Sequence, residues 1–234
     1  MSEVVVDEWL KARLELLEEE KKLSRLSASV AKKRRSLPRR EVKEDYAFIG
    51  ANGKSTLSAL FGEHSQLIVY HMMMGAGAKS GCKLCSFFID QFMGGLPHLK
   101  PRATLAVVAK NDFANIKAWI SEKKVDWDNN VFYSSSCSTF SEDLQVSFTP
   151  EQIANKTCTY NFNRTWNYGS EAPGISVFYK DAETGRIYHT YSTYAAGLGN
   201  LGSVLGLLDL TPFGRDEEEK RNMWWVKHKE EYTS

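Results

Sequence analysis

The chain has 234 residues, 42% of them hydrophobic, which is enough for one large domain with additions or for two small domains. Its 30 Lys and Arg residues against 29 Asp and Glu residues leave a formal net charge of +1. A nearly neutral chain has no general attraction for nucleic acid, anionic lipid or acidic substrates. The N-terminus lacks the basic and apolar regions of a signal peptide, and no apolar run reaches the length of a membrane span. We therefore expect a cytoplasmic protein with no nucleic-acid partner and no membrane contact.

Residues 7–35 are predicted to form a long charged helix with one apolar stripe. The stripe contains four residues at heptad spacing, Trp9, Leu16, Leu23 and Val30. Such a stripe needs a partner surface. The favoured partner is the chain's own core, and the alternative is a homodimer through this helix, because a dimerisation arm also presents heptads.

From residue 46 the pattern changes to short apolar runs separated by Gly, Pro and Asn, which is typical of alternating strands and helices. Strands are predicted at 66–73, 104–109 and 130–133, helices at 84–93, 113–121 and 201–208, and a hairpin at 175–191. The first three strands and the helices between them predict a parallel, right-handed βαβαβ run. We expect an α/β core with a central mixed sheet flanked by helices at residues 46–215. Residues 1–45 then form an N-terminal helix and basic linker, and residues 216–234 a charged, aromatic tail that packs on the core.

Cys82 and Cys85 follow the glycine-rich loop after the first buried strand and open a predicted helix. At a helix start, exposed backbone N–H groups and the helix dipole favour an anion, so the pKa of Cys82 should be lowered. One turn later, Cys85 can attack a mixed disulfide formed at Cys82 and release the reduced partner. Lys83 adds positive charge nearby. The pattern predicts a dithiol/disulfide redox site with Cys82 as the nucleophile and Cys85 as the resolving cysteine.

Two other interpretations of the pair stay open. One is a structural zinc site completed by Cys137, Cys158 or a histidine, and the other is a pair of inert buried thiols. Redox chemistry is favoured because neither remaining cysteine has a paired spacing. We expect no metal ion and no organic cofactor. Whether Cys137 and Cys158 pair with each other is left open.

Two further residues have both a functional and a structural interpretation. His71 precedes the glycine-rich loop and either faces Cys82 or is a hydrogen-bonded core histidine, which is favoured. Pro173 precedes a predicted strand, and is either a cis proline that sets backbone polar groups beside the sulfurs or an ordinary strand-entry proline. Residues 50–56 end like a phosphate-binding loop, but Phe48 stands at the motif's first glycine and no buried strand precedes it. Nucleotide binding is therefore not predicted.

Several motifs spread along the chain carry a family resemblance. They are Trp9-x-x-Ala12-Arg13, Arg34-Arg35-x-Leu37-Pro38, Gln66-Leu67-x-x-Tyr70-His71-x-Met73, Gly81-Cys82-x-x-Cys85-Ser86, Gly174-x-Ser176-Val177-Phe178, His189-Thr190-Tyr191-Ser192-x-Tyr194 and Leu208-Asp209-Leu210-Thr211-Pro212-x-Gly214-Arg215. With these motifs the chain resembles the thioredoxin superfamily and, more closely, the thioredoxin-like domain-of-unknown-function family numbered 899 of bacteria and fungi. The resemblance implies a thioredoxin-like fold with an N-terminal helical extension.

The resemblance also implies how the site is arranged. The backbone of Pro173, Gly174 and Ile175 is expected beside the two sulfurs as a substrate platform, with His71, Lys83 and Ser86 in supporting positions. Lys83 is a departure, because the family often has proline after the first cysteine. The extra N–H group and positive charge would stabilise the Cys82 thiolate and make the pair more oxidising.

The function predicted from the sequence is that of a thiol-disulfide oxidoreductase-like protein. Its partner would be a disulfide-bearing protein or a small sulfur-containing metabolite, and the aromatic stretch 160–168 would wall a pocket for the latter. Two alternatives are a peroxidase-like enzyme in which Cys82 reduces a hydroperoxide, and a non-catalytic thioredoxin-like binding module with inert cysteines.

Overall fold

The structure is a computed structural model that describes residues 7–123, 125–218 and 222–232. Its contacts divide the chain into two compact units, Met1–Arg39 and Arg40–Ser234. The division expected from the sequence, at residues 45 and 215, stays a prediction. Within the described residues, no helix combines the length and the apolar character needed to cross a membrane.

The first unit contains the predicted long helix, α1, which runs from Glu8 to Arg35 and confirms that prediction. The Asp7 side chain caps its start by accepting a hydrogen bond from the Trp9 backbone N–H. Four basic residues in its last turn complement the helix dipole. No described side chain of α1 is buried, and Trp9 is 68% exposed. Which surface the apolar stripe contacts stays a prediction.

The second unit is built on an eight-stranded sheet, in the part of the chain that the structure describes, with the order β1-β10-β9-β4-β5-β6-β2-β3. The strands are β1 Arg40–Glu41, β2 Ala47–Gly50, β3 Gly53–Thr56, β4 Gln66–His71, β5 Thr104–Ala109, β6 Phe132–Ser134, β9 Gly174–Lys180 and β10 Ile187–Tyr194. β4, β5 and β6 run parallel, whereas β9 is antiparallel to both β4 and β10. The predicted parallel run and the predicted hairpin are both confirmed. A separate two-stranded sheet pairs β7 Thr159–Tyr160 with β8 Arg164–Thr165.

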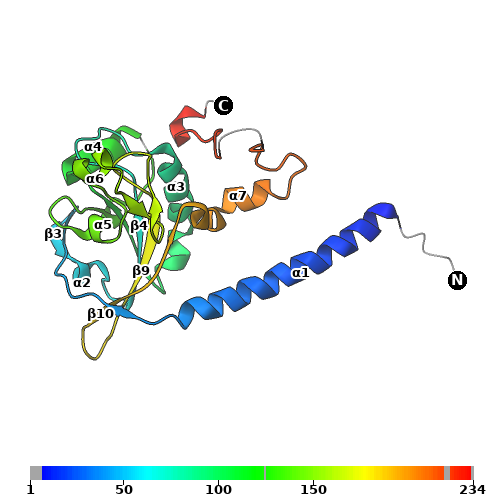
Figure 1. The fold of residues 1–234 in the computed structure, drawn as a ribbon, viewed down its shortest axis with the longest axis horizontal. Coiled ribbons are helices and arrows are strands. Elements are labelled where there is room, and N and C mark those ends of the chain that lie inside the picture. The colour runs from blue at the N-terminus through cyan, green and yellow to red at the C-terminus, as the bar shows by residue number, and fades with distance from the viewer. Residues whose placement is uncertain (1–6, 124, 219–221, 233–234) are drawn as a thin grey trace. The chain divides into compact units, whose positions relative to one another are not determined.

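Helices cover both faces of this sheet (Figure 1). They are α2 Leu57–Leu60, α3 Lys83–Leu99, α4 Phe113–Lys123, α5 Phe140–Asp143, α6 Pro150–Ala154 and α7 Ser203–Leu208, with 3-10 turns η1 Asn129–Val131, η2 Ala195–Leu201 and η3 Lys229–Glu231. One core cluster joins the inner sides of α3, α4 and α7 to the sheet. The other packs α2 and α5 on the opposite face. The sheet is thus buried on both faces, as its nearly continuous apolar strands require.

The topology is that of the predicted thioredoxin-like fold. The central unit is β4–α3–β5, in which the two strands are parallel neighbours. The β9–β10 hairpin then adds to the free edge of β4, and α7 follows it. β6, β2 and β3 extend the sheet beyond β5, and β1 extends it beyond β10. The sequence prediction of fold class, a mixed sheet flanked by helices with an N-terminal helix, is confirmed.

The segment that ends like a phosphate-binding loop is a β-hairpin. Contrary to the sequence prediction, a strand does precede it, because β2 carries Phe48, which is fully buried. β2 turns directly into the antiparallel β3 through Gly53, whose φ of +92° favours glycine. A tight turn between antiparallel strands does not form the strand-to-helix cradle that holds a phosphate.

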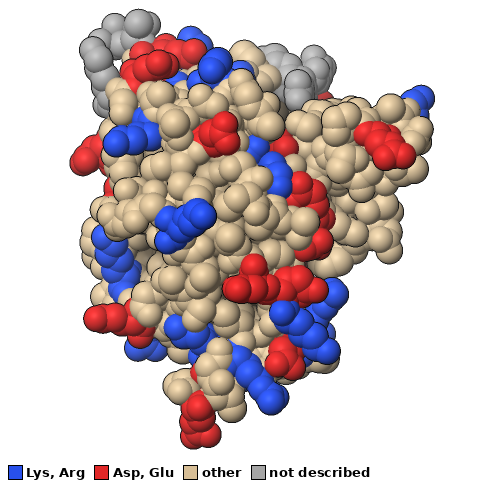
Figure 2. Space-filling view, turned by 90° about the vertical axis from the view of Figure 1, so that its left-hand side faces the viewer, with Lys and Arg blue, Asp and Glu red and all other residues tan. Residues whose placement is uncertain are grey.

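The C-terminal segment contacts the helices around the sheet. Trp225 packs edge-on against Phe87 of α3, with 5.7 Å between the ring centroids, and Val226 is fully buried. Lys123 at the end of α4 forms an ion pair with Glu230. Figure 2 shows Lys and Arg interspersed with Asp and Glu on one face of the molecule, as expected from the balanced charge of the chain.

Candidate active site

The two cysteines lie where β4, after a ten-residue loop at 72–81, gives way to α3. Cys82 is the N-cap of α3, with an extended backbone, and its N–H donates to the Met73 carbonyl oxygen at 3.0 Å. Gly81 just before it lies against Trp119 of α4: an added Cβ would come within 2.7 Å of the indole ring. Only glycine fits here, so the packing of α4 sets the position of Cys82.

The loop is also held from the end of β5. Asn111 is fully buried, and its Nδ2 donates to the Ala78 carbonyl oxygen at 2.8 Å. Gly77 in the same loop has a φ of +75°. The loop therefore has a defined shape that follows from the parallel β4–β5 pair.

The two sulfurs differ in exposure. Cys82 is partly buried, whereas Cys85 is 1% exposed, and both are free thiols. The Met73 backbone N–H donates to Cys85 Sγ at 3.4 Å. Tyr70 is also fully buried and lies beside the same sulfur: burial, followed by the charge of Cys85, raises the pKa of the Tyr70 hydroxyl.

The pKa values of the two thiols are pushed apart. The hydrogen bond from Cys85, the backbone N–H groups of Cys85 and Leu84, and the charge of Lys83 together outweigh burial and lower the pKa of Cys82 to about 6. Burial, followed by the interaction with Cys82, raises the pKa of Cys85 well above its ordinary value. At neutral pH the arrangement favours a thiolate at Cys82 and a thiol proton at Cys85.

Two of the predicted supporting residues lie next to the pair in sequence and in space. Ser86 is buried, and its Oγ donates to the Cys82 carbonyl oxygen at 3.2 Å. It stabilises the first turn of α3. Lys83 is exposed, so water screens its charge, and its contribution to the Cys82 pKa follows those of the hydrogen bonds.

Of the predicted platform residues, Pro173 lines the same cavity as Cys85. Its carbonyl oxygen accepts a hydrogen bond from the Tyr160 hydroxyl. The described residues contain no cis peptide bond, so Pro173 follows a trans peptide, in line with the strand-entry alternative. Gly174 pairs with the end of β4, and an added Cβ would come within 2.7 Å of the Tyr194 ring. Ile175 is buried in the core cluster that contains Cys85.

A mostly apolar cavity of about 360 Å³ opens beside Cys85. This size is within the range of small-molecule sites in proteins. Its walls come from β4, α3, the residue before β9, η2, α7 and the C-terminal segment: Tyr70, Met73, Leu84, Cys85, Phe88, Pro173, Ala195, Ala196, Leu198, Gly199, Leu205, Arg215, Glu217, Asn222 and Met223. None of residues 160–168 lines it, so the expectation that this aromatic stretch walls the pocket is wrong. Tyr160 packs instead against Tyr194 and Trp166.

His71 lies on the other face of the sheet from the cysteines. In a strand, neighbouring side chains point to opposite faces: Tyr70 joins the cluster with Cys85, whereas Val69 joins the opposite one. The fully buried His71 bonds through Nε2 to Ser176 Oγ at 2.9 Å, and its ring lies 5.8 Å from that of Phe140. The structure does not bring His71 to Cys82.

Ser176 continues a hydrogen-bonded chain across the sheet. Its hydroxyl contacts Ser192 Oγ at 2.9 Å, and Ser192 Oγ contacts Nε2 of His189 at 2.7 Å. Burial, followed by the charge of His189, lowers the pKa of His71 to about 3. Burial likewise lowers the pKa of His189. Both histidines are therefore neutral at physiological pH.

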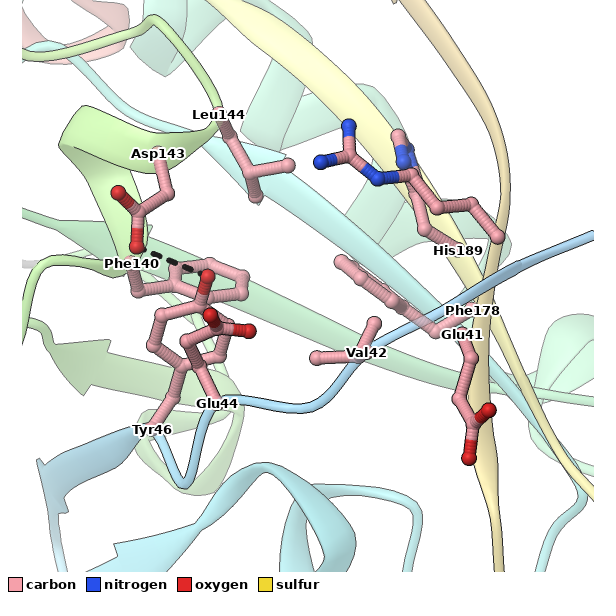
Figure 3. Close-up of a pocket in the computed structure, with 10 residues that line it drawn as sticks. Glu41, Val42, Glu44, Tyr46, Phe140, Asp143, Leu144, Phe178 and His189 are labelled. Carbon is pink, nitrogen blue, oxygen red and sulfur yellow. Dashed lines mark hydrogen bonds between the residues drawn. The ribbon is translucent and has the colours of Figure 1, made fainter.

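His189, at the end of this series of hydrogen bonds, lines a second cavity of about 240 Å³. Figure 3 shows the hydrogen bond from Tyr46 to Asp143, 2.9 Å long, on one side of it and His189 on the other. Charged residues, among them Glu41 and Glu44, form part of its lining. Sequence reasoning missed this cavity, since it forms only because the segment after α1 pairs with β10 as β1.

Glu171 is a second feature that the sequence did not indicate. Its carboxyl is close to the glycine-rich loop: a Cβ at Gly75 would lie 3.1 Å from Glu171 Oε1. Ser147 Oγ donates to the same oxygen at 2.8 Å. Burial raises the pKa of Glu171 to about 8, so this carboxyl is largely protonated at neutral pH. No local sequence motif could have indicated Glu171, because the segments that surround its carboxyl lie far apart in the sequence.

The other two cysteines are in separate surroundings. Cys137 is exposed and its Sγ donates to the Ala47 carbonyl oxygen at 3.5 Å, whereas Cys158 is buried in an apolar cluster with Val146 and Tyr160. Both are free thiols. Among the described residues, no group of three or more His, Cys, Asp and Glu side chains is arranged to hold a metal ion.

Comparison with known proteins identifies a family. A sequence model with the description "Bacterial protein of unknown function (DUF899)" matches residues 2–232. No curated protein matches the chain.

Among solved structures, the chain is similar to the bacterioferritin comigratory protein of Xanthomonas campestris, at 12% identity over 71% of this chain and 96% of that one, with a TM-score of 0.43. It is also similar to a mutant PrxQ of Xylella fastidiosa, at 14% identity over 70% and 87% of the two chains (TM-score 0.39). A third similar structure is the mitochondrial 2-Cys peroxiredoxin of Plasmodium falciparum, at 11% identity over 74% and 94% (TM-score 0.40). Likenesses at this level assign no activity.

Proposed function

This chain belongs to the DUF899 family of bacterial proteins of unknown function, and we propose that its Cys82–Cys85 pair is the dithiol/disulfide centre of a thiol-disulfide oxidoreductase. One observation carries the proposal: at the start of α3 a partly buried thiol with a lowered pKa stands next to a buried thiol with a raised pKa. A nucleophile that is a thiolate and a resolving thiol that keeps its proton are the two parts that thiol–disulfide exchange requires.

In the proposed reaction the Cys82 thiolate attacks one sulfur of a substrate disulfide. The substrate S–S bond breaks, a mixed disulfide forms at Cys82, and one substrate thiolate leaves. Cys85 then loses its proton to the medium and attacks the Cys82 sulfur, which releases the second substrate thiolate. The substrate gains two electrons and two protons, and the protein pair is oxidised to a disulfide.

The surroundings of the pair support this chemistry. The backbone of Pro173, Gly174 and Ile175 is the proposed platform for the substrate, because Pro173 and Cys85 line one cavity. The partner is proposed to be a disulfide-bearing protein or a small sulfur compound. A cytoplasmic location is part of the proposal, since a reducing compartment would keep the four cysteines as the free thiols described above.

The deciding measurement is the reduction potential of the pair. Purified protein is equilibrated in glutathione or dithiothreitol buffers, and free thiols are then counted by alkylation and mass. We expect a reversible two-electron transition between roughly −120 and −270 mV, the range of known redox proteins. The double variant Cys137→Ser/Cys158→Ala should keep it, and Cys82→Ser should abolish it. Failure to form any disulfide, or zinc bound in equimolar amount, would contradict the proposal.

A binding module with inert cysteines makes a different prediction. In that case the variant Cys82→Ser/Cys85→Ser would still retain its cellular partner and rescue a strain that lacks the protein. We expect the double variant to fold, with an unchanged circular dichroism spectrum, and to fail in the rescue.

A further inference from the structure

The cavity beside Cys85 has a wall that the central thioredoxin-like unit does not provide. Leu198 comes from η2, Leu205 from α7 and Met223 from the C-terminal segment, and all three line the cavity. Leu198 and Leu205 are buried, at 3% and 1% exposure. Tyr70 and Phe88 add further aromatic surface to the lining. A surface of this kind favours an apolar occupant.

Among the described residues, the two charged ones that line the cavity are each bonded to another group. Arg215 pairs with the Asp209 carboxylate through Nε at 2.6 Å and also through Nη2. The Glu217 carboxylate accepts the Met223 backbone N–H at 2.6 Å. Neither of these charges requires a ligand of opposite charge, which argues for an uncharged occupant.

One residue of the cysteine pair lines the cavity and the other does not. Cys85 lines it, together with Leu84, whereas Cys82 does not. In thiol–disulfide exchange the Cys82 sulfur carries the substrate group R in the mixed disulfide, and Cys85 must approach that same sulfur. A group R seated in the cavity would keep the mixed disulfide next to Cys85. The two thiol steps then take place beside the cavity.

We propose that the substrate is a small uncharged disulfide, R–S–S–R, whose apolar group R occupies the cavity beside Cys85. This inference rests on the proposed function and deepens it, because it selects a small apolar molecule over a protein disulfide. In a single turnover the reduced protein converts one R–S–S–R to two R–SH, and its pair becomes the Cys82–Cys85 disulfide. The electrons balance with no further reductant, and the proton that the Cys82 thiolate lacks comes from the medium.

The test compares two probes of equal size. Dipropyl disulfide and bis(2-hydroxyethyl) disulfide differ only in their terminal groups, methyl or hydroxyl. Pre-reduced protein is mixed with each probe, and with insulin as a protein disulfide, and the rate of Cys82–Cys85 disulfide formation is divided by the rate of free dithiothreitol with the same probe. We expect a normalised rate about tenfold higher for dipropyl disulfide than for the other two, as burial of one or two extra apolar groups would provide.

A cavity-filling variant tests whether the preference comes from this site. Ala196 lines the cavity and is exposed, so Ala196→Phe would fill the space without crowding the core. The smaller Ala196→Leu guards against misfolding of the larger substitution. Asn200→Phe is the matched control, since Asn200 is exposed and does not line the cavity. We expect the ratio of the two probe rates to fall towards one in Ala196→Phe, to fall part of the way in Ala196→Leu, and to stay near ten in Asn200→Phe.

The outcomes separate this inference from the proposed function. Equal normalised rates for the two small probes, a faster reaction with insulin, or a ratio unchanged by Ala196→Phe would overturn the inference while the oxidoreductase proposal stands. If reduced wild-type protein forms no Cys82–Cys85 disulfide with any probe, both are overturned.

Discussion

The two faces of the central sheet bury polar groups in different ways. On the face that α3, α4 and α7 cover, the partly buried thiol of Cys82 at a helix start has its pKa lowered to about 6, and its neighbour Cys85 lines an apolar cavity. On the face that α2 and α5 cover, two histidines are hydrogen-bonded through serines, and a cavity with charged residues in its lining lies at one end.

The difference shows what determines reactivity in this fold. The thiol of Cys85, together with the backbone N–H groups at the start of α3, stabilises an anion at Cys82. Buried histidines without a charged partner instead lose their protons, because burial disfavours the charged form. The first face can therefore supply a nucleophile, whereas the histidines of the second act as neutral hydrogen-bonding groups in the core.

The largest effect is expected from removing the Cys85 thiol, which donates a hydrogen bond to the Cys82 sulfur. In Cys85→Ala the Cys82 thiolate loses the hydrogen bond that stabilises it most. The pKa of Cys82 should therefore rise from about 6 towards the ordinary cysteine value of about 8.5. Thiolate ultraviolet absorbance against pH measures it. Cys158→Ala, also a buried cysteine, is the control and should leave the titration in place. A Cys82 titration unchanged in Cys85→Ala would contradict this account of the first face.

A smaller effect is expected on the second face. His71→Ala removes a buried ring and its hydrogen bond to Ser176, so it should cost about 2 kcal/mol of unfolding free energy near pH 8. The Cys82 titration should not move, since the ring lies on the other face. If the Cys82 pKa shifts by more than about half a unit, the two faces are coupled and the comparison fails.

The stability of His71→Ala should also depend on pH differently from that of the wild type. The folded pKa of His71 is about 3, below its unfolded value of about 6.5, so the unfolded state binds a proton first and wild-type stability falls as pH decreases below about 6.5. His71→Ala lacks this dependence, so its loss of unfolding free energy relative to wild type should shrink towards zero near pH 5. Val69→Ala, on the same strand and face, should keep its deficit at both pH values. Urea unfolding near pH 8 and near pH 5 checks both.

Glu171 should give a stability difference with the opposite sign of pH dependence. Its folded pKa of about 8 lies above its ordinary value, so its stabilisation of the fold is present at low pH and is lost as pH rises through about 8. Glu171→Gln keeps the neutral form. As pH rises from about 5 to about 8, the unfolding free energy of Glu171→Gln should increase relative to that of wild type, as measured by urea unfolding. A constant difference across this range would show that the carboxyl is ionised in the folded protein.

The smallest effect is expected from Lys83→Met. Because Lys83 is exposed and its charge follows the hydrogen bonds in importance, the pKa of Cys82 should rise by only about 0.3 unit. The shift should vanish in high salt. A rise of a full unit would make the Lys83 charge, and not the hydrogen bond from Cys85, the main source of thiolate stability on the first face.

The strands and helices around the pair were predictable because their signals are local. The apolar runs at 66–71 and 104–109 are buried parallel strands, and the cysteine pair opens a helix as expected. Alternation along β4 puts His71 and Tyr70 on opposite faces, but it does not say which face meets α3. That choice depends on how α3 packs, and hence on contacts with residues far along the chain.

By itself, the sequence determined the order of the central strands and helices and the place of Cys82 at a helix start. These follow from apolar periodicity and from the spacing of two cysteines, which act over a few residues. The thioredoxin-like topology was what the family resemblance implied. The homodimer through residues 7–35 stays a prediction. Only the tertiary structure decided which residues wall the cavity, that His71 bonds to Ser176, and that Tyr46 meets Asp143 across 97 positions. Such contacts join segments with no shared local pattern, and they form only when the sheet and its covering helices are assembled.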